Sequence, residues 1–236
     1  MKELKAFLKL IKIEHTLFAA PFFILAIIVI KVNNPSFLEL SFPKLLYMTI
    51  CFICARALGM AWNRIIDFHI DFKNPRTATR PLQTREISIK KTYLFTFFLT
   101  ILFIYSASRI NPFAFIFSPF LILYMIFYAY TKRFTYLCHF ILGSIHAMLP
   151  LAVSICLFGK VYGYLFLLSL GVMFLIAASD IIYALQDIRF DIREKLYSIP
   201  AKYGLNKSIA ISFVLYGVSL TFFIVFFFYL KNFKPT

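Results

Sequence analysis

Charged side chains are scarce in this chain. Asp, Glu, Lys and Arg make up 15% of its 236 residues, whereas hydrophobic residues make up 61%. A soluble domain has about 25% charged and about 45–50% apolar residues, so this composition indicates a membrane protein. The formal net charge of +15 does not predict a nucleic-acid partner, because the basic residues lie in short segments between apolar runs and not on one solvated face.

Two further absences limit the possible folds. No segment alternates polar and apolar residues with a period of two, so the chain is not expected to form strands. Cys51 and Cys54 are accompanied by neither a second cysteine pair nor a βαβ pattern. We therefore expect inert, lipid-embedded thiols and no disulfide framework. The first apolar run lacks a small-residue cleavage site, so we expect an uncleaved first span.

Seven apolar stretches are long enough to cross a hydrocarbon core about 30 Å thick, which needs about 20 residues. An α-helix satisfies its backbone hydrogen bonds within one segment, which lipid requires. The sequence therefore predicts an all-α integral membrane bundle. The seven predicted spans are residues 16–32, 45–66, 92–108, 112–130, 137–158, 162–186 and 208–230.

Lysine and arginine are distributed unevenly among the connections. Eighteen of the 25 lie at the N-terminus and in segments 64–91, 132–133 and 187–207, whereas six lie on the opposite side. The positive-inside rule predicts that the first group faces the cytoplasm. We expect a multi-pass protein of a bacterial inner membrane, with its active site on the cytoplasmic side.

Five of the ten carboxylates fall in two clusters at the predicted cytoplasmic ends of spans two and six. In the first cluster Asn63, Asp67 and Asp71 are spaced four and four, so a continuing helix would stack them on one face. Mg²⁺ suits such oxygen donors, because it takes one or two protein carboxylates, keeps waters and binds phosphate oxygens of a substrate. The alternative is a solvated helix end with surface salt bridges.

The second cluster repeats this spacing with Tyr183, Asp187 and Asp191, and Asp180 lies about two turns before Asp187. Two acidic faces on the same side of a helical bundle can hold Mg²⁺ ions against a diphosphate. The pair of clusters therefore favours a metal-diphosphate site over chance scattering of acids.

Four motifs together resemble those of the UbiA family of membrane prenyltransferases. They are Asn63-x-x-x-Asp67-x-x-x-Asp71 with Arg76-Thr77 and Arg80-Pro81-Leu82, Tyr130-x-Lys132-Arg133-Phe134-Thr135, Tyr183-x-x-x-Asp187-x-x-x-Asp191, and Ser198-Ile-Pro-Ala-Lys202-x-Gly204. The resemblance implies a helical bundle with a cytoplasm-facing cavity that binds Mg²⁺ and a polyprenyl diphosphate. The family usually has nine spans. We therefore expect one membrane-embedded prenyltransferase domain over residues 1–236, truncated by the last two spans.

The resemblance also implies roles for individual residues. The four aspartates Asp67, Asp71, Asp187 and Asp191 would be catalytic, and together with Asn63 they would form the metal-diphosphate set. Lys132 would bind diphosphate oxygens, and Arg133 would assist it or contact the acceptor.

Arg56 lies seven residues before Asn63, about two helical turns deeper on the same face. An unpaired guanidinium at that depth is costly, so an intramembrane charge is a functional hypothesis. Family members that use aromatic acids have an arginine here, which implies that Arg56 binds the acceptor carboxylate. A structural bridge to Asp180 or Glu14 is the alternative.

Lys12, Asp180 and Tyr183 are further candidates for substrate binding. Lys12 and the following Glu14-His15-Thr16, like Tyr183-Ala-Leu-Gln-Asp187, resemble the subgroup that prenylates 4-hydroxybenzoate or a dihydroxynaphthoate.

The expected reaction is Mg²⁺-dependent transfer of a polyprenyl group to such an acid in ubiquinone or menaquinone biosynthesis. The alternatives are a non-quinone acceptor, such as a tetrapyrrole or a glycerol phosphate, and a cation-coupled transporter, which would place its acids nearer the midplane.

Overall fold

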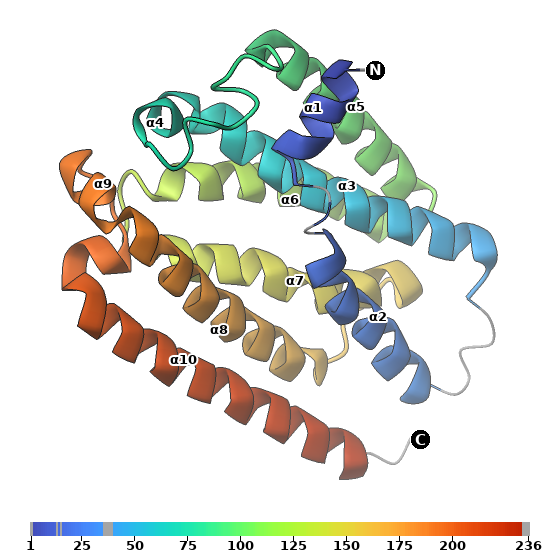
Figure 1. The fold of residues 1–236 in the computed structure, drawn as a ribbon. Coiled ribbons are helices and arrows are strands. Elements are labelled where there is room, and N and C mark those ends of the chain that lie inside the picture. The colour runs from blue at the N-terminus through green and yellow to red at the C-terminus, as the bar shows by residue number, and fades with distance from the viewer. Residues whose placement is uncertain (1, 13, 15, 35–39, 233–236) are drawn as a thin grey trace. The chain divides into compact units, whose positions relative to one another are not determined.

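The computed structural model describes the chain except for residues 1, 13, 15, 35–39 and 233–236 (Figure 1). The described residues divide into two compact units. Unit 1 comprises Met1–Pro21 and Leu40–Ala129, and unit 2 comprises Phe22–Glu39 and Tyr130–Thr236. The first acidic motif lies in unit 1 and the second lies in unit 2.

Unit 1 is built around two antiparallel spanning helices. Its helices are α1 (Lys2–Leu10), α3 (Phe42–Ile66), α4 (Phe68–Lys73), α5 (Ile89–Ser108) and most of α6 (Pro112–Thr131). α3 packs along α5. At the end of this pair, Phe7 and Leu10 of α1 are buried with Ala57 of α3 and with Leu82 and Ile87 of the loop before α5. This core holds α1 against the loop that follows the first acidic motif.

Unit 2 is centred on α8. Its helices are the larger part of α2 (Thr16–Val32), α7 (Cys138–Phe158), α8 (Leu165–Ala184), the 3₁₀ turn η2 (Leu185–Asp187), α9 (Ile188–Arg193) and α10 (Ile199–Asn232). α8 packs against both α7 and α10 (Figure 1). Its buried Ala178 and Ile181 share a core cluster with Ile199 and Leu215 of α10.

Two glycines allow these helices to approach closely. A Cβ at Gly143 of α7 would lie 2.3 Å from the carbonyl oxygen of Met173 in α8. A Cβ at Gly171 of α8 would lie 2.5 Å from the ring of Phe223 in α10. Small residues at helix contacts are the usual means of close packing in membranes, where lipid is as apolar as the side chains.

The predicted all-α membrane architecture is confirmed. Six described helices are long and apolar enough to cross a membrane: Phe42–Ile66, Ile89–Ser108, Pro112–Thr131, Cys138–Phe158, Leu165–Arg193 and Ile199–Lys231. The first predicted span corresponds to α2, which has 17 residues. Three short helices were not predicted from the sequence, α1, α4 and α9, because hydropathy over about 20 residues does not detect helices of nine residues or fewer.

We expect Gly143→Ala to destabilise unit 2, because the added methyl group meets backbone of Met173, which cannot rotate away. Overpacking of this kind costs about 1–3 kcal/mol. Gly217→Ala on α10 is the control, since nothing lies within 4 Å of its Cβ position. Thermal unfolding in detergent should show a lower melting temperature for the first variant only. Equal melting temperatures would contradict the close contact.

Candidate functional site

The first acidic motif begins at the end of α3. The helix breaks at Asp67, whose φ and ψ are −89° and 10°. Helical hydrogen bonds nevertheless continue through the break, from Asp67 N–H to the carbonyl of Asn63 (3.0 Å) and from Asp71 N–H to the carbonyl of Asp67 (2.8 Å). Asn63 Nδ2 donates to Asp67 Oδ2 at 3.2 Å. The expected placement of Asn63 and Asp67 on one face is therefore confirmed.

Asp71, the third residue of this motif, is buried and neutralised. Its side chain accepts a hydrogen bond from Arg80 Nη1, and Arg64 Nη1 lies 3.9 Å from the same oxygen. Thr77 Oγ1 donates to the backbone carbonyl of Asp71 at 2.7 Å. A carboxylate taken out of water needs such partners, because the desolvation penalty is several kcal/mol per ion.

The loop that carries Arg80 is fixed by its own hydrogen bonds. Asn74 Oδ1 accepts from the N–H of Arg76 at 3.0 Å, and the carbonyl of Asn74 accepts from the N–H of Thr77 at 2.9 Å. Gln83 Nε2 donates to the carbonyl of Phe68 at 3.3 Å, which ties the loop to the start of α4. The hydrogen-bonded backbone of this loop thus positions the guanidinium of Arg80 beside Asp71.

The second acidic motif has the same form in unit 2. The backbone breaks at Asp187, with φ and ψ of −106° and 5°, between η2 and α9. Asp191 has no exposed surface. Lys132 Nζ lies 2.8 Å from its Oδ1, an ion pair without hydrogen-bond alignment, and Ser198 Oγ donates to its Oδ2 at 2.8 Å. In both motifs the middle acid lies at a helix break and the third acid is buried against a base.

Lys132 is bound to the α9–α10 loop by its backbone as well as by its side chain. The N–H of Tyr197 donates to the carbonyl of Lys132 at 2.7 Å, and the N–H of Leu196 donates to the carbonyl of Asp191 at 2.8 Å. Arg133, the next residue, lies over the ring of Tyr130 with 5.2 Å to its centroid. The basic segment and the second acidic motif therefore form one connected structure.

His139 continues this structure into the helical core. Its Nδ1 lies 2.6 Å from Asp180 Oδ2, and its Nε2 accepts from the N–H of Ile199 at 3.3 Å. Because Nε2 is an acceptor, Nδ1 carries the proton that is shared with Asp180. His139 is 2% exposed. The imidazole thus links the predicted substrate residue Asp180 to the first turn of α10, beside Ser198.

Three contacts of the acids were not predicted from the sequence, those with His139, Ser198 and Arg80. His139 lies 41 residues from Asp180, so no helical spacing connects them. Arg80 and Ser198 reach their aspartates across loops of irregular backbone. Their presence in the family-like motifs was the available signal, but it did not indicate their partners.

The other predicted substrate-binding residues are Arg56, Lys12 and Tyr183. Arg56 is half-buried in α3, and the described residues provide it with no carboxylate partner. Lys12 follows α1 and has a left-handed backbone with φ of 47°. Tyr183 is exposed on α8. His15, which belongs to the motif at the start of span one, lies outside the described residues.

Few histidine, cysteine and carboxylate side chains of the described residues lie close enough together to bind a metal ion. Among the described side chains of these types, no three come together in a group that could hold an ion. The first motif offers the carboxylate of Asp67 beside the amide of Asn63, whose Nδ2 donates to Asp67 and whose Oδ1 accepts from Arg64 Nη1 at 3.3 Å. A carboxylate together with water and phosphate oxygens is a hard oxygen set that fits Mg²⁺. It does not fit a closed zinc site, which takes four protein ligands.

Comparisons with known proteins show which family model and which relatives this chain resembles. Residues 19–235 match the model of the UbiA prenyltransferase family. A 4-hydroxybenzoate octaprenyltransferase of Haemophilus ducreyi is 34% identical over 183 residues, which cover 74% of this chain and 62% of that protein. A digeranylgeranylglyceryl phosphate synthase of Methanococcus vannielii is 32% identical over 228 residues, which cover 93% and 77%. A polyprenyl transferase, ausN, of Emericella nidulans is 29% identical over 171 residues. This chain spans 51% of the ausN protein.

Solved structures show the same fold. The apo structure of a UbiA homologue from Aeropyrum pernix K1 has a TM-score of 0.84 and 27% identity, and the match covers 93% of this chain and 80% of that one. A UbiA homologue from Archaeoglobus fulgidus, solved with DMAPP and Mg²⁺, has a TM-score of 0.71 and 18% identity, with coverage of 94% and 77%.

We expect Lys132→Ala to destabilise the protein by about 3 kcal/mol, because it leaves Asp191 buried without its cation. Asp191→Asn in the same chain should recover part of this loss, since a neutral amide still accepts from Ser198. Arg193→Ala is the control, because the Arg193 side chain is 63% exposed and ion pairs made by exposed bases contribute at most about 1 kcal/mol. A double-mutant cycle of thermal unfolding in detergent measures the coupling. If Lys132→Ala costs no more than Arg193→Ala, the ion pair is not structural.

Proposed function

The chain belongs to the UbiA prenyltransferase family, and on that premise we propose that it transfers a polyprenyl group from polyprenyl diphosphate to a hydroxylated aromatic acid with Mg²⁺. The observation that carries the proposal is the form of the two motifs. Each holds a base in place with a buried carboxylate, Arg80 on Asp71 and Lys132 on Asp191. Bases fixed in this way, next to further acids, are suited to a metal-bound diphosphate.

We propose that the five residues of the metal-diphosphate set have two different roles. Asn63, Asp67 and Asp187 would provide oxygens for Mg²⁺, whereas Asp71 and Asp191 hold Arg80 and Lys132. When bound, Mg²⁺ would supply positive charge to the diphosphate oxygens. The Archaeoglobus fulgidus protein shares the fold at 18% identity, so the metal proposal for this chain rests on its own carboxylates.

Lys132 would stabilise the leaving group. Its side chain is one-third exposed, whereas the Asp191 side chain is fully buried, so the ammonium group can reach a ligand while Asp191 keeps it in position. An ammonium ion has three donors, which allows Lys132 to contact Asp191 and diphosphate oxygens at the same time. Arg133 would contribute a second positive charge beside it.

The proposed reaction begins with heterolysis of the allylic carbon–oxygen bond, whose electron pair leaves with the diphosphate. The ring carbon ortho to the phenolic oxygen then attacks the allylic cation and forms the new carbon–carbon bond. That carbon loses its proton to water, and aromaticity is restored. The chain's own residues contribute charge stabilisation and positioning, so no strong general base is needed.

Arg56 would bind the carboxylate of the acceptor. It is half-buried in α3, about two turns from Asn63, without a carboxylate partner among the described residues. Guanidinium and carboxylate match in bidentate geometry. Asp180, held by His139, together with Tyr183 and Lys12, would contact the rest of the acceptor. We further propose that the site faces the cytoplasm and that the product enters quinone biosynthesis.

A prenylated glyceryl phosphate is the second candidate acceptor. The Methanococcus vannielii synthase matches this chain over 93% of its length, and Arg56 would suit a phosphate as well as a carboxylate. The two candidates differ in the nucleophile, since an alcohol oxygen would replace the ring carbon. Turnover with each acceptor separates them.

We expect Asp67→Asn to lower prenyl transfer by roughly two to three orders of magnitude and to weaken the apparent affinity for Mg²⁺, because the change removes a charge that balances the metal. Glu86→Gln, which removes an exposed carboxylate from the loop before α5, is the control. Transfer of labelled prenyl diphosphate in membranes, titrated with Mg²⁺, measures both. Wild-type turnover in Asp67→Asn, or full activity in EDTA, would refute the metal mechanism.

We expect Arg56→Ala to reduce kcat/KM for 4-hydroxybenzoate by an amount equivalent to about 2–5 kcal/mol, the cost of truncating one partner of a buried charge pair. The value for phenol should change little, because phenol lacks the carboxylate. The KM for prenyl diphosphate should also stay the same. If the wild type uses phenol and 4-hydroxybenzoate equally well, Arg56 does not select the acceptor. Preference for a prenylated glyceryl phosphate would favour the second candidate.

A further inference from the structure

α1 is an amphipathic helix with three distinct faces. Lys2, Lys5 and Lys9 lie along one side, at helical spacings of three and four. Phe7 and Leu10 lie on the opposite side, in the core that α1 shares with α3. Leu4 and Leu8 lie between these faces and are 51% and 37% exposed. A helix with a basic face and an exposed apolar edge is suited to the surface of a membrane.

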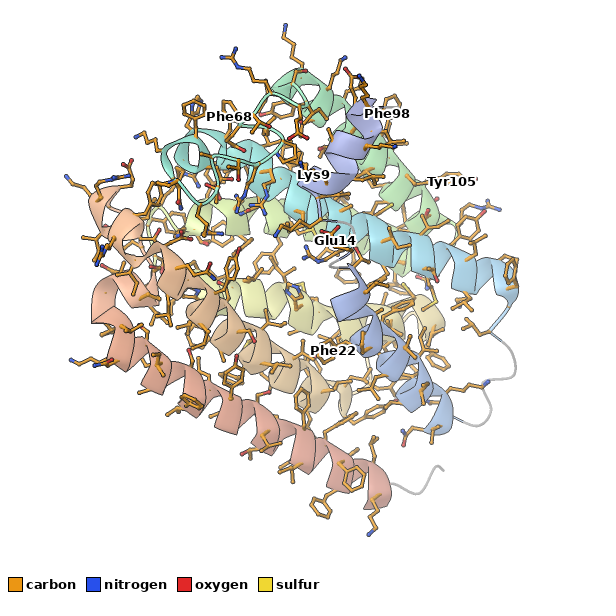
Figure 2. All side chains as sticks on the ribbon, viewed as in Figure 1. Lys9, Glu14, Phe22, Phe68, Phe98 and Tyr105 are labelled. Carbon is orange, nitrogen blue, oxygen red and sulfur yellow. The ribbon has the colours of Figure 1, made fainter. Side chains whose placement is uncertain are left out.

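The exposed edge of α1 forms one wall of an apolar groove in unit 1, with a volume of about 250 Å³. Its lining includes Leu4 and Leu8 of α1, Ala57 of α3, and Phe95, Phe98 and Leu102 of α5. Figure 2 labels Phe98 on α5 and Lys9 on α1. From Phe95 to Leu102 the wall runs about 10 Å along α5. The groove is therefore elongated along a spanning helix, as an acyl chain would require.

The groove end near the start of α5 is strongly basic. Six bases lie on α1, in the loop before α5 and at the start of α5, with Glu3 and Glu86 among them; they are Lys2, Lys5, Lys9, Arg85, Lys90 and Lys91. Lys9 pairs with Glu86 at 3.2 Å, and Lys91 pairs with Glu3. Both acids are thus already neutralised. Four positive charges remain in excess, which favours an anionic headgroup.

We propose that this groove binds one anionic phospholipid of the bilayer, with an acyl chain between α1 and α5 and its phosphate on Lys2, Lys5 and Lys90. The groove lining is apolar throughout and contains none of the residues of the acidic motifs. A phospholipid needs no metal, whereas a diphosphate held by Mg²⁺ would need carboxylates. Since α1 also packs on Leu82 and Ile87, the bound lipid steadies the loop that carries Arg80.

Trp62 is a built-in probe for this site, because it is the single tryptophan of the sequence. Its ring meets that of Tyr93 on α5 at 6.3 Å. Trp62 lies five residues from Ala57, or about 7.5 Å along α3. The full chain would be reconstituted in phosphatidylcholine vesicles that contain a minor fraction of phosphatidylglycerol. Either lipid would carry brominated acyl chains, which quench tryptophan fluorescence on contact.

We expect brominated phosphatidylglycerol to quench Trp62 more strongly than brominated phosphatidylcholine at the same mole fraction, with saturation at one site. The double variant Lys2→Gln, Lys5→Gln should reduce this preference on the order of tenfold. Lys207→Gln, Lys231→Gln on α10 removes the same charge elsewhere and should retain it. Equal quenching by the two lipids, or the same loss in both double variants, would overturn the proposal.

Two further measurements test the groove itself. Leu4→Gln, Leu8→Gln keeps every lysine but makes the groove wall polar, so the preference for phosphatidylglycerol should again be lost. If it persists, the lipid is attracted only to surface charge. Geranylgeranyl diphosphate with Mg²⁺ should leave the quenching unchanged. Displacement of the brominated lipid by this donor would assign the groove to the prenyl tail, whether or not the chain catalyses prenyl transfer.

Discussion

A carboxylate that is withdrawn from water must find a cation or hydrogen-bond donors, and both acidic motifs are organised around this requirement. Asp191 is fully buried, forms an ion pair with Lys132 and accepts a hydrogen bond from Ser198. Asp71 forms an ion pair with Arg80 and a longer one with Arg64. The same contacts that neutralise the acids also connect segments that lie far apart in sequence. Stability and the placement of positive charge therefore depend on the same atoms.

The two acids of the first motif lie in different surroundings. Asp67, at the helix break, is half-buried and accepts from Asn63, whereas Asp71 is buried against Arg80. Two acids four residues apart thus acquire different environments, as different roles demand.

The sequence predicted those features that depend on local periodicity. Hydrophobic length gave the spanning helices, and the four-residue spacing gave the contact between Asn63 and Asp67. Contacts across loops could not be predicted from the sequence, because Arg80, Ser198 and His139 meet their acids through irregular backbone or through packing between helices. α1 was missed because it has nine residues and the lysines on its exposed side lower the mean hydropathy of the segment, although the opposite side packs on the core.

Gly204 separates the first turn of α10 from its long apolar part. Its φ and ψ of 74° and 179° are available to glycine and not to other residues without strain, and nothing lies within 4 Å of its Cβ position. Ser198 and the N–H of Ile199 lie before this bend, bound to Asp191 and His139. A spanning helix adjusts its tilt to the thickness of the bilayer around it. With a glycine bend between them, the apolar part of α10 can tilt in thinner or thicker membranes while the polar first turn keeps its position.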